Sequence, residues 1–109
     1  MSYKFMSNIK NFSDINNPNN AYLTTNINEE ITFKDNDIEK KAFFLMIRAH
    51  SDNDLLIEIL PYGYGVYVPA NEMWSVDSID GISGFIIKKA FNGNNLLNSA
   101  KVQWMLGYK

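Results

Sequence analysis

One short stretch of the sequence brings together the residue types of a nucleophilic catalyst. His50, the only histidine, is followed directly by Ser51 and Asp52. A serine nucleophile needs a base facing its hydroxyl group and an acid facing the base. Neighbouring residues of a strand point to opposite faces, so this spacing does not turn the three side chains toward one another. We therefore expect His50 to be a strand-end residue at the surface or at a subunit contact, and we expect no catalytic residue.

Acidic residues are the second group that could do chemistry. Glycosidases hold two carboxyl groups across a cleft, but Glu72, Asp77 and Asp80 fall near one turn, where Asp is also favoured for backbone reasons. Two Asp-Asn-Asp triplets, at 35–37 and 52–54, offer the oxygen ligands that calcium takes. A strand between the triplets would keep them apart, and the EF-hand pattern is missing. We interpret the triplets as solvated turns and expect neither a metal nor another cofactor.

Aromatic residues form the most suggestive group. Their rings can stack on sugars or fill protein interfaces. Glycines in the Tyr-Gly-Tyr-Gly stretch give this segment flexibility, which favours ring exposure. Two of the rings also fit strand patterns, so a core or subunit contact is the competing interpretation for them. The candidate contact residues for a ligand or partner are Tyr62, Tyr64, Tyr67 and Trp74.

Composition narrows the class of protein. The chain has 109 residues, of which 46% are hydrophobic and 20% charged, as in a single globular domain. It has no cysteine, which excludes a disulfide framework and a thiolate metal site. Its net charge of −2 gives no electrostatic footprint for nucleic acid. The longest apolar run, 42–47, is too short for a membrane span, and the first residues lack the apolar core of a signal peptide. We therefore expect no nucleic-acid or membrane partner.

The elements that must position these residues read as short strands. Residues 21–27 are rich in β-formers, and residues 29–34 alternate, with Ile31 and Phe33 on one face. The same kind of pattern recurs along the rest of the chain. Further strands are predicted within 54–60, 66–68, 73–76, 84–90 and 100–109.

Residues 41–50 form a near-continuous apolar run. Such a run is typical of a strand that is buried on both faces. A helix over 38–49 is the alternative, because several of these residues are good helix formers. We favour a strand that begins near Phe43.

Turn signals complete the pattern. Asp80–Gly81 predicts a two-residue hairpin turn, since both positions of that turn need a positive φ, and Asn92–Gly93 predicts another turn. About seven or eight strands at this spacing predict an all-β fold: a small antiparallel β-sandwich or jelly-roll-like domain.

The first twenty residues differ from the rest. They carry scattered large apolar residues and end in Asn-Asn-Pro-Asn-Asn, a cluster that marks a turn. We predict an N-terminal arm over 1–20 and a β-sandwich domain over 21–109; a short first strand or a helical turn packed on the domain is the alternative. The apolar residues with which the arm would contact a neighbouring subunit are Tyr3, Phe5, Met6, Ile9 and Phe12.

Four segments after residue 40 carry a resemblance: AFFLMIRA, LLIEIL, GVYVPANEMWSVDSIDGISGFIIKKA and KVQWMLGYK. This order of hydrophobic strands and polar turns resembles that of small virion proteins of tailed bacteriophages. In that family a β-sandwich domain forms capsid decorations, head–tail or tail accessory parts, baseplate parts or fibre modules. The resemblance brings no catalytic residues.

The leading hypothesis is a non-enzymatic structural virion protein of a tailed phage. It would form a homo-oligomer and dock onto other virion proteins, and it would be made in the bacterial cytoplasm and end in the virion. The alternative is a carbohydrate-binding or receptor-binding module that uses the Tyr/Trp loop on a host-surface glycan. A phage inhibitor of a host factor is a third possibility.

Overall fold

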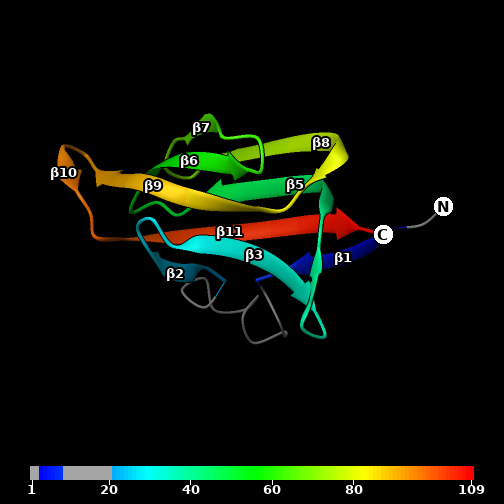
Figure 1. The fold of residues 1–109 in the computed structure, drawn as a ribbon. Helices are drawn as coiled ribbons and strands as arrows, with labels where there is room; N and C mark the ends of the chain where they lie inside the picture. The colour runs from blue at the N-terminus through cyan, green and yellow to red at the C-terminus, as the bar shows by residue number, and fades with distance from the viewer. Residues whose placement is uncertain (1–2, 9–20) are drawn as a thin grey trace.

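The computed structural model describes residues 3–8 and 21–109. Within these ranges every regular element is a β-strand, so the predicted all-β class is confirmed (Figure 1). None of the described residues belongs to a helix that could cross a membrane. The strands are β1 (Lys4–Ser7), β2 (Leu23–Asn26), β3 (Glu30–Asp35), β4 (Ile38–Lys40), β5 (Ala42–Ala49), β6 (Asp54–Leu60), β7 (Tyr64–Val68), β8 (Met73–Ile82), β9 (Gly84–Asn92), β10 (Asn95–Leu96) and β11 (Ser99–Tyr108).

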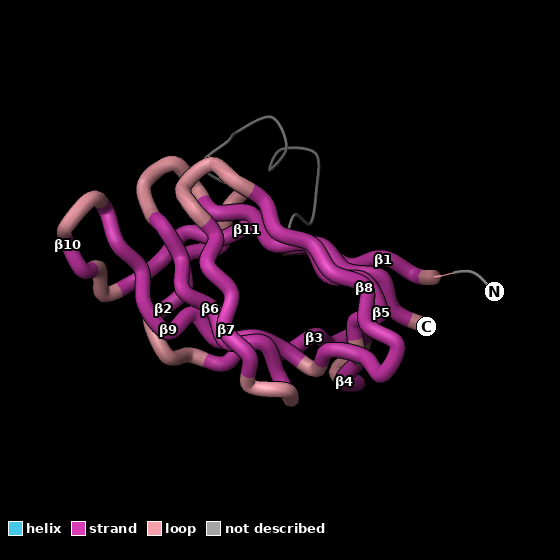
Figure 2. The backbone as a smooth tube through the Cα atoms, turned by 90° about the horizontal axis from the view of Figure 1, so that it is seen from above, coloured by secondary structure: helices cyan, strands magenta, loops and turns pink. Residues whose placement is uncertain are grey.

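The strands form two antiparallel sheets. Sheet A has the order β1-β11-β5-β8, with β2 also pairing with β11. Sheet B has the order β4-β3-β9-β6-β7, with β10 pairing with β9. Figure 2 shows the sheets as two layers, with β5, β8 and β11 in one and β6, β7 and β9 in the other. The arrangement is that of a β-sandwich.

The strand pairs are nested along the chain. β2 pairs with β11, β3 with β9, β5 with β8, and β6 with β7. Two further pairings, β11 with β5 and β9 with β6, join these pairs into sheets. Each nested pair is antiparallel, so the chain runs as one long hairpin folded over itself.

Alternation of side chains builds the core between the sheets. Ile31 and Phe33 point inward from β3, as their spacing predicts, and Phe33 is fully buried. The Phe33 ring lies 6.2 Å from the ring of Phe85 in its own sheet and 5.4 Å from that of Trp104 in sheet A. The two sheets are thus packed directly against each other.

The run at 41–50 is a strand, as favoured, and not a helix. β5 occupies Ala42–Ala49 between β11 and β8. Its inward residues Leu45 and Ile47 are fully buried, while Phe44 and Met46 on its outer face are only partly covered. The predicted burial of this strand is therefore confirmed for its inner face, whereas its outer face is only partly buried.

The predicted hairpin turn at Asp80–Gly81 is wrong. β8 continues through both residues to Ile82, and β9 begins in the other sheet. β5 and β8 pair at Phe44↔Asp77 and again at Ala42↔Ile82. An advance of two residues along β5 therefore corresponds to five residues along β8. Gly81 lies within this bulge, and its positive φ (87°) is a backbone conformation that glycine adopts readily. The turn predicted at Asn92–Gly93 lies one residue later: Gly93 and Asn94 join β9, which ends at Asn92, to β10.

The N-terminal segment contributes a strand of its own. β1 pairs with the last residues of β11, and Met6 packs against the core. Tyr3 and Phe5 are exposed, while Ile9 and Phe12 lie outside the described residues. Residues 4–7 therefore behave as the short first strand considered above.

Asn8 fixes the end of this strand to β11. Its side-chain oxygen accepts a hydrogen bond from the backbone N–H of Trp104 (2.7 Å), and its side-chain nitrogen donates to the carbonyl of Ala21 (2.9 Å). The backbone N–H of Asn8 also donates to the carbonyl of Trp104 (3.3 Å). Asn8 and Ala21 thus meet at one edge of sheet A, although residues 9–20 separate them in the sequence.

Candidate binding surfaces

Tyr62 and Tyr64 lie where the β6–β7 turn of sheet B faces β8 of sheet A. Their rings stack at 6.2 Å with planes 19° apart. The Tyr62 hydroxyl donates a hydrogen bond to the carbonyl of Gly81 (2.7 Å), which ties the turn to the bulge of β8. Burial raises the pKa of Tyr64, with a smaller contribution from Tyr62. The two rings remain 46% and 41% exposed, and they lie beside residues 77–80 of β8.

Tyr67 and Trp74 point in other directions. Tyr67 is registered with Leu56 on the outer face of sheet B and is 57% exposed. Trp74 is registered with the buried Ile47, is partly buried, and packs against the core. The structure therefore does not bring the four predicted aromatic residues onto one surface.

A hollow of about 450 Å³ lies beside Tyr67 on the outer face of sheet B. Glycines at two of its lining positions leave space where side chains would otherwise stand. Glu58 is registered with Gly65, so its carboxylate rises next to that space. The lining residues are Leu56, Ile57, Glu58, Gly63, Gly65, Val66, Tyr67 and Lys88.

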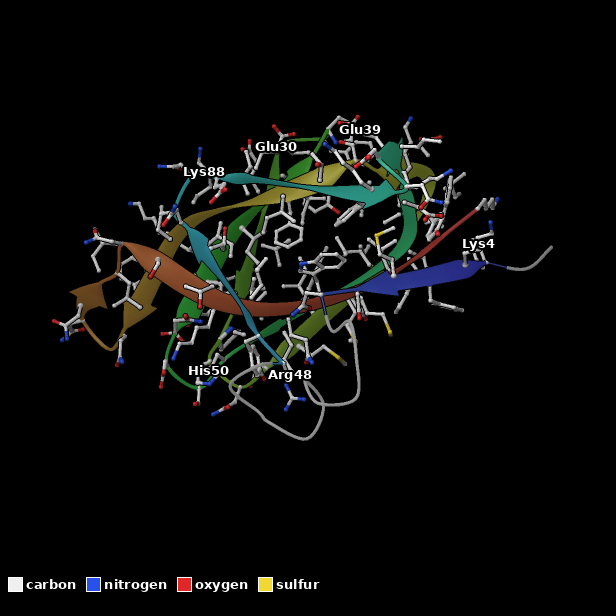
Figure 3. The ribbon with its side chains drawn as sticks, turned by 90° about the horizontal axis from the view of Figure 1, so that it is seen from below. Lys4, Glu30, Glu39, Arg48, His50 and Lys88 are labelled. Atoms are coloured by element: carbon white, nitrogen blue, oxygen red, sulfur yellow. The ribbon has the colours of Figure 1, made fainter. Side chains whose placement is uncertain are left out.

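A bulge in β9 directs a lysine to this hollow. β6 and β9 pair at Ile57↔Ile87 and next at Leu56↔Lys89, so β9 has one extra residue, Lys88. Bulges of this kind re-aim a side chain and often occur beside functional sites. Lys88 points away from the core on the sheet B side, opposite to Arg48 on the sheet A side (Figure 3).

The outer face of sheet A is rich in apolar side chains. Met46 and Met105 are registered partners, and Phe44, Gly107 and Phe5 form the next row across three strands. A Cβ on Gly107 would lie 3.6 Å from Phe5 Cε1 and 3.8 Å from Phe44 Cβ, so these side chains flank the glycine. We call this surface the apolar face; its residues are Phe5, Phe44, Met46, Met73 and Met105.

His50 sits in a polar cluster at the other end of β5. Its Nδ1 accepts a hydrogen bond from the backbone N–H of Asp52 (3.0 Å), and the hydroxyl of Ser51 lies 3.4 Å from the same atom. Lys101 donates to the carboxylate of Asp52 (2.9 Å); this hydrogen bond and then the lysine charge lower the pKa of Asp52. The rings of Tyr22 and His50 pack in a T-shaped arrangement, with their centroids 4.7 Å apart. Every one of these contacts helps to hold the β5–β6 turn.

The Asp-Asn-Asp triplets anchor turns and strand ends through hydrogen bonds, so their interpretation as solvated turns holds only in part. Asn53 is buried, accepts a hydrogen bond from the backbone N–H of Lys101 (2.8 Å) and donates to its carbonyl (3.1 Å). Asp54 accepts from the N–H of Ala70 (2.8 Å). In the other triplet, Asp35 accepts from the hydroxyl of Tyr108 (2.7 Å), and this hydrogen bond raises the pKa of Tyr108. Among the described residues no group of acids or histidine could hold a metal ion.

Sequence reasoning missed Leu56, Glu58, Gly65 and Lys88 as site residues. The first three follow from the short β6–β7 hairpin, whose register places Glu58 opposite Gly65 and Leu56 opposite Tyr67. The contribution of Lys88 depends on a bulge that no local pattern indicates. The apolar face was likewise missed, although Phe44 and Met46 alternate with the buried residues of the same strand.

No protein-family model matches the chain, and neither does any curated protein or solved structure.

Proposed function

We propose that this protein is a non-enzymatic structural subunit that works by self-association, with a place in the virion of a tailed phage, where it would dock onto other virion proteins. The observation that supports self-association is the apolar face. It places apolar side chains on the outer face of sheet A, whose inner face already forms part of the core. Contiguous exposed apolar patches of this kind mark interaction sites. The place in a virion comes from the resemblance over residues 40–109.

We propose a second copy of the chain as the partner for the apolar face. Arg48 lies on this face next to Met73, and Asp77 lies next to Phe44, several residues along the strands. Neither charge has an ion-pair partner within 3–8 and 21–109. A two-fold axis between two facing copies, perpendicular to the strands, brings Arg48 of one copy toward Asp77 of the other. Their charges are therefore complementary in a symmetric dimer.

We also infer that the sandwich is a jelly roll. The nested pairs β2–β11, β3–β9, β5–β8 and β6–β7 support this inference, because a jelly roll is an eight-stranded double sheet built from two Greek keys. Viral capsid proteins and lectins both use this architecture. The fold is thus compatible with assembly, and a fold alone does not establish a function.

We propose that the chain has no catalytic activity of its own. His50 Nδ1 is occupied by the Asp52 N–H, and the acids nearest to it are engaged in turns.

Light scattering after size exclusion, over a concentration series of the full chain, tests self-association. One defined oligomer at micromolar concentration supports the proposal, and a monomer at every concentration contradicts it. Mass spectrometry of purified virions from a phage that encodes the chain tests the location, because a virion protein is retained in them at a fixed copy number.

A further inference from the structure

We propose that the hollow beside Tyr67 binds a neutral saccharide. This site lies on sheet B, on the opposite side of the sandwich from the apolar face, so the proposal does not depend on self-association. Its three binding groups would be the Tyr67 ring, the Glu58 carboxylate and the Lys88 ammonium group.

The ring of Tyr67 supplies an apolar surface at the edge of the hollow. It is more than half exposed, and Leu56 beside it on β6 is also exposed. A pyranose presents C–H groups on one face and hydroxyl groups around its rim, which suits an aromatic ring beside polar groups. The hollow falls in the size range of small-molecule sites.

Glu58 and Lys88 supply the hydrogen bonds. A carboxylate accepts from sugar hydroxyls, and an ammonium group donates to them. Neither side chain forms an ion pair in the part of the chain that the structure describes, so both are available to a ligand. One negative and one positive group line the hollow, which favours a neutral ligand over a charged one.

Gly65 makes the hollow and also provides its sharpest test. Its φ lies outside the positive range, and a Cβ there would meet only the carbonyl oxygen of Ile57, at 3.9 Å. A side chain at this position therefore fits the backbone and rises into the hollow. Because glycine weakens a strand, Gly65→Val should leave the melting temperature unchanged or raise it while filling the site.

Binding of sugar probes to the full chain is measured by saturation-transfer NMR and by chemical-shift titration. The probes are the methyl glycosides of glucose, galactose, mannose and N-acetylglucosamine, with methyl glucuronide as a charged comparison. We expect a dissociation constant on the order of 1 mM for the best neutral probe, as befits a ligand of that size. Gly65→Val and Tyr67→Ala should each weaken binding tenfold or more. Tyr3→Ala, which removes an exposed tyrosine outside the hollow, should leave it unchanged.

Three results would overturn the proposal. The first is that no probe binds at about 20 mM, a concentration 20-fold above the expected dissociation constant. The second is binding that Gly65→Val and Tyr67→Ala, both shown to be folded by their melting curves, do not weaken. The third is binding of the glucuronide alone, which would assign the hollow to anions. None of these results bears on the oligomeric state, so failure here is distinguishable from failure of the proposed assembly role.

Discussion

Met46 of β5 and Met105 of β11 are registered partners at the centre of the outer face of sheet A. Their neighbours along the two strands, Leu45 and Leu106, point the other way and are fully buried. The same two strands therefore carry apolar side chains on both faces. In a sheet that faces solvent on one side, alternation normally places polar residues there. The departure from that pattern is the physical basis for the proposed contact between copies.

The N-terminal strand should contribute to the stability of the domain. Asn8→Ala removes two side-chain hydrogen bonds, one to the N–H of Trp104 and one to the carbonyl of Ala21. Loss of partners for partly buried backbone groups should lower the free energy of unfolding by about 1–3 kcal/mol. Urea denaturation measures this change, and Asn95→Ala, at an exposed position of β10, is the matched control. Equal stability of the two variants would mean that β1 is not held in the way described.

The Asp52–Lys101 contact should make stability depend on pH in one direction. The pKa of Asp52 is lowered from 3.8 in the folded state, so the charged form favours folding. Its contribution is present above about pH 3.8, the unfolded value, and is lost as the pH falls through the lower folded value. Urea midpoints of the unmodified protein and Asp52→Asn should therefore differ at pH 6 and converge at pH 2.

The size of that difference is small because the pair is exposed, and added salt should reduce it. Asp80→Asn, which removes an exposed carboxylate without an ion-pair partner among the described residues, controls for the change in net charge. A difference for Asp52→Asn that persisted unchanged at pH 2 would contradict the assignment.

Two glycines of sheet B should respond in opposite ways to the same substitution. A Cβ at Gly84 would overlap the carbonyl oxygen of Ile31 on the neighbouring strand, so Gly84→Ala forces β3 and β9 apart. We expect a loss of about 3 kcal/mol or more, since backbone strain of this kind cannot be relieved by one side chain. Gly65→Ala adds a Cβ in open space and should be neutral or stabilising. Thermal denaturation of the two variants checks the β3–β9 register; similar melting temperatures would show that register to be wrong.

Local patterns in the sequence predicted the inner faces of the strands well. Ile31 and Phe33 on β3, and Val102, Trp104 and Leu106 on β11, are buried as their alternation indicates. Alternation identifies core residues because one face of each strand meets the opposite sheet.

Features set by distant pairing could not be predicted in that way. β1 pairs with residues about a hundred positions later, and nothing within residues 4–7 specifies that partner. Gly81 has the positive φ expected of a turn, yet it lies in a bulge of β8, because the chain there crosses to the other sheet. The aromatic residues divide among three locations for a similar reason: strand register, and not sequence proximity, decides which face each ring occupies.

The oligomeric state of matched charge variants tests the proposed assembly most directly. Phe5 and Met73 are 68% and 58% exposed in the single chain, so Phe5→Glu with Met73→Glu should leave its fold intact. Ile38→Glu, at a 61% exposed position of β4 in sheet B, is the control. In light scattering after size exclusion, the unmodified chain and the control should be oligomers and the double variant a monomer. A monomeric unmodified chain, or a double variant that assembles as before, would contradict the proposed contact through the apolar face.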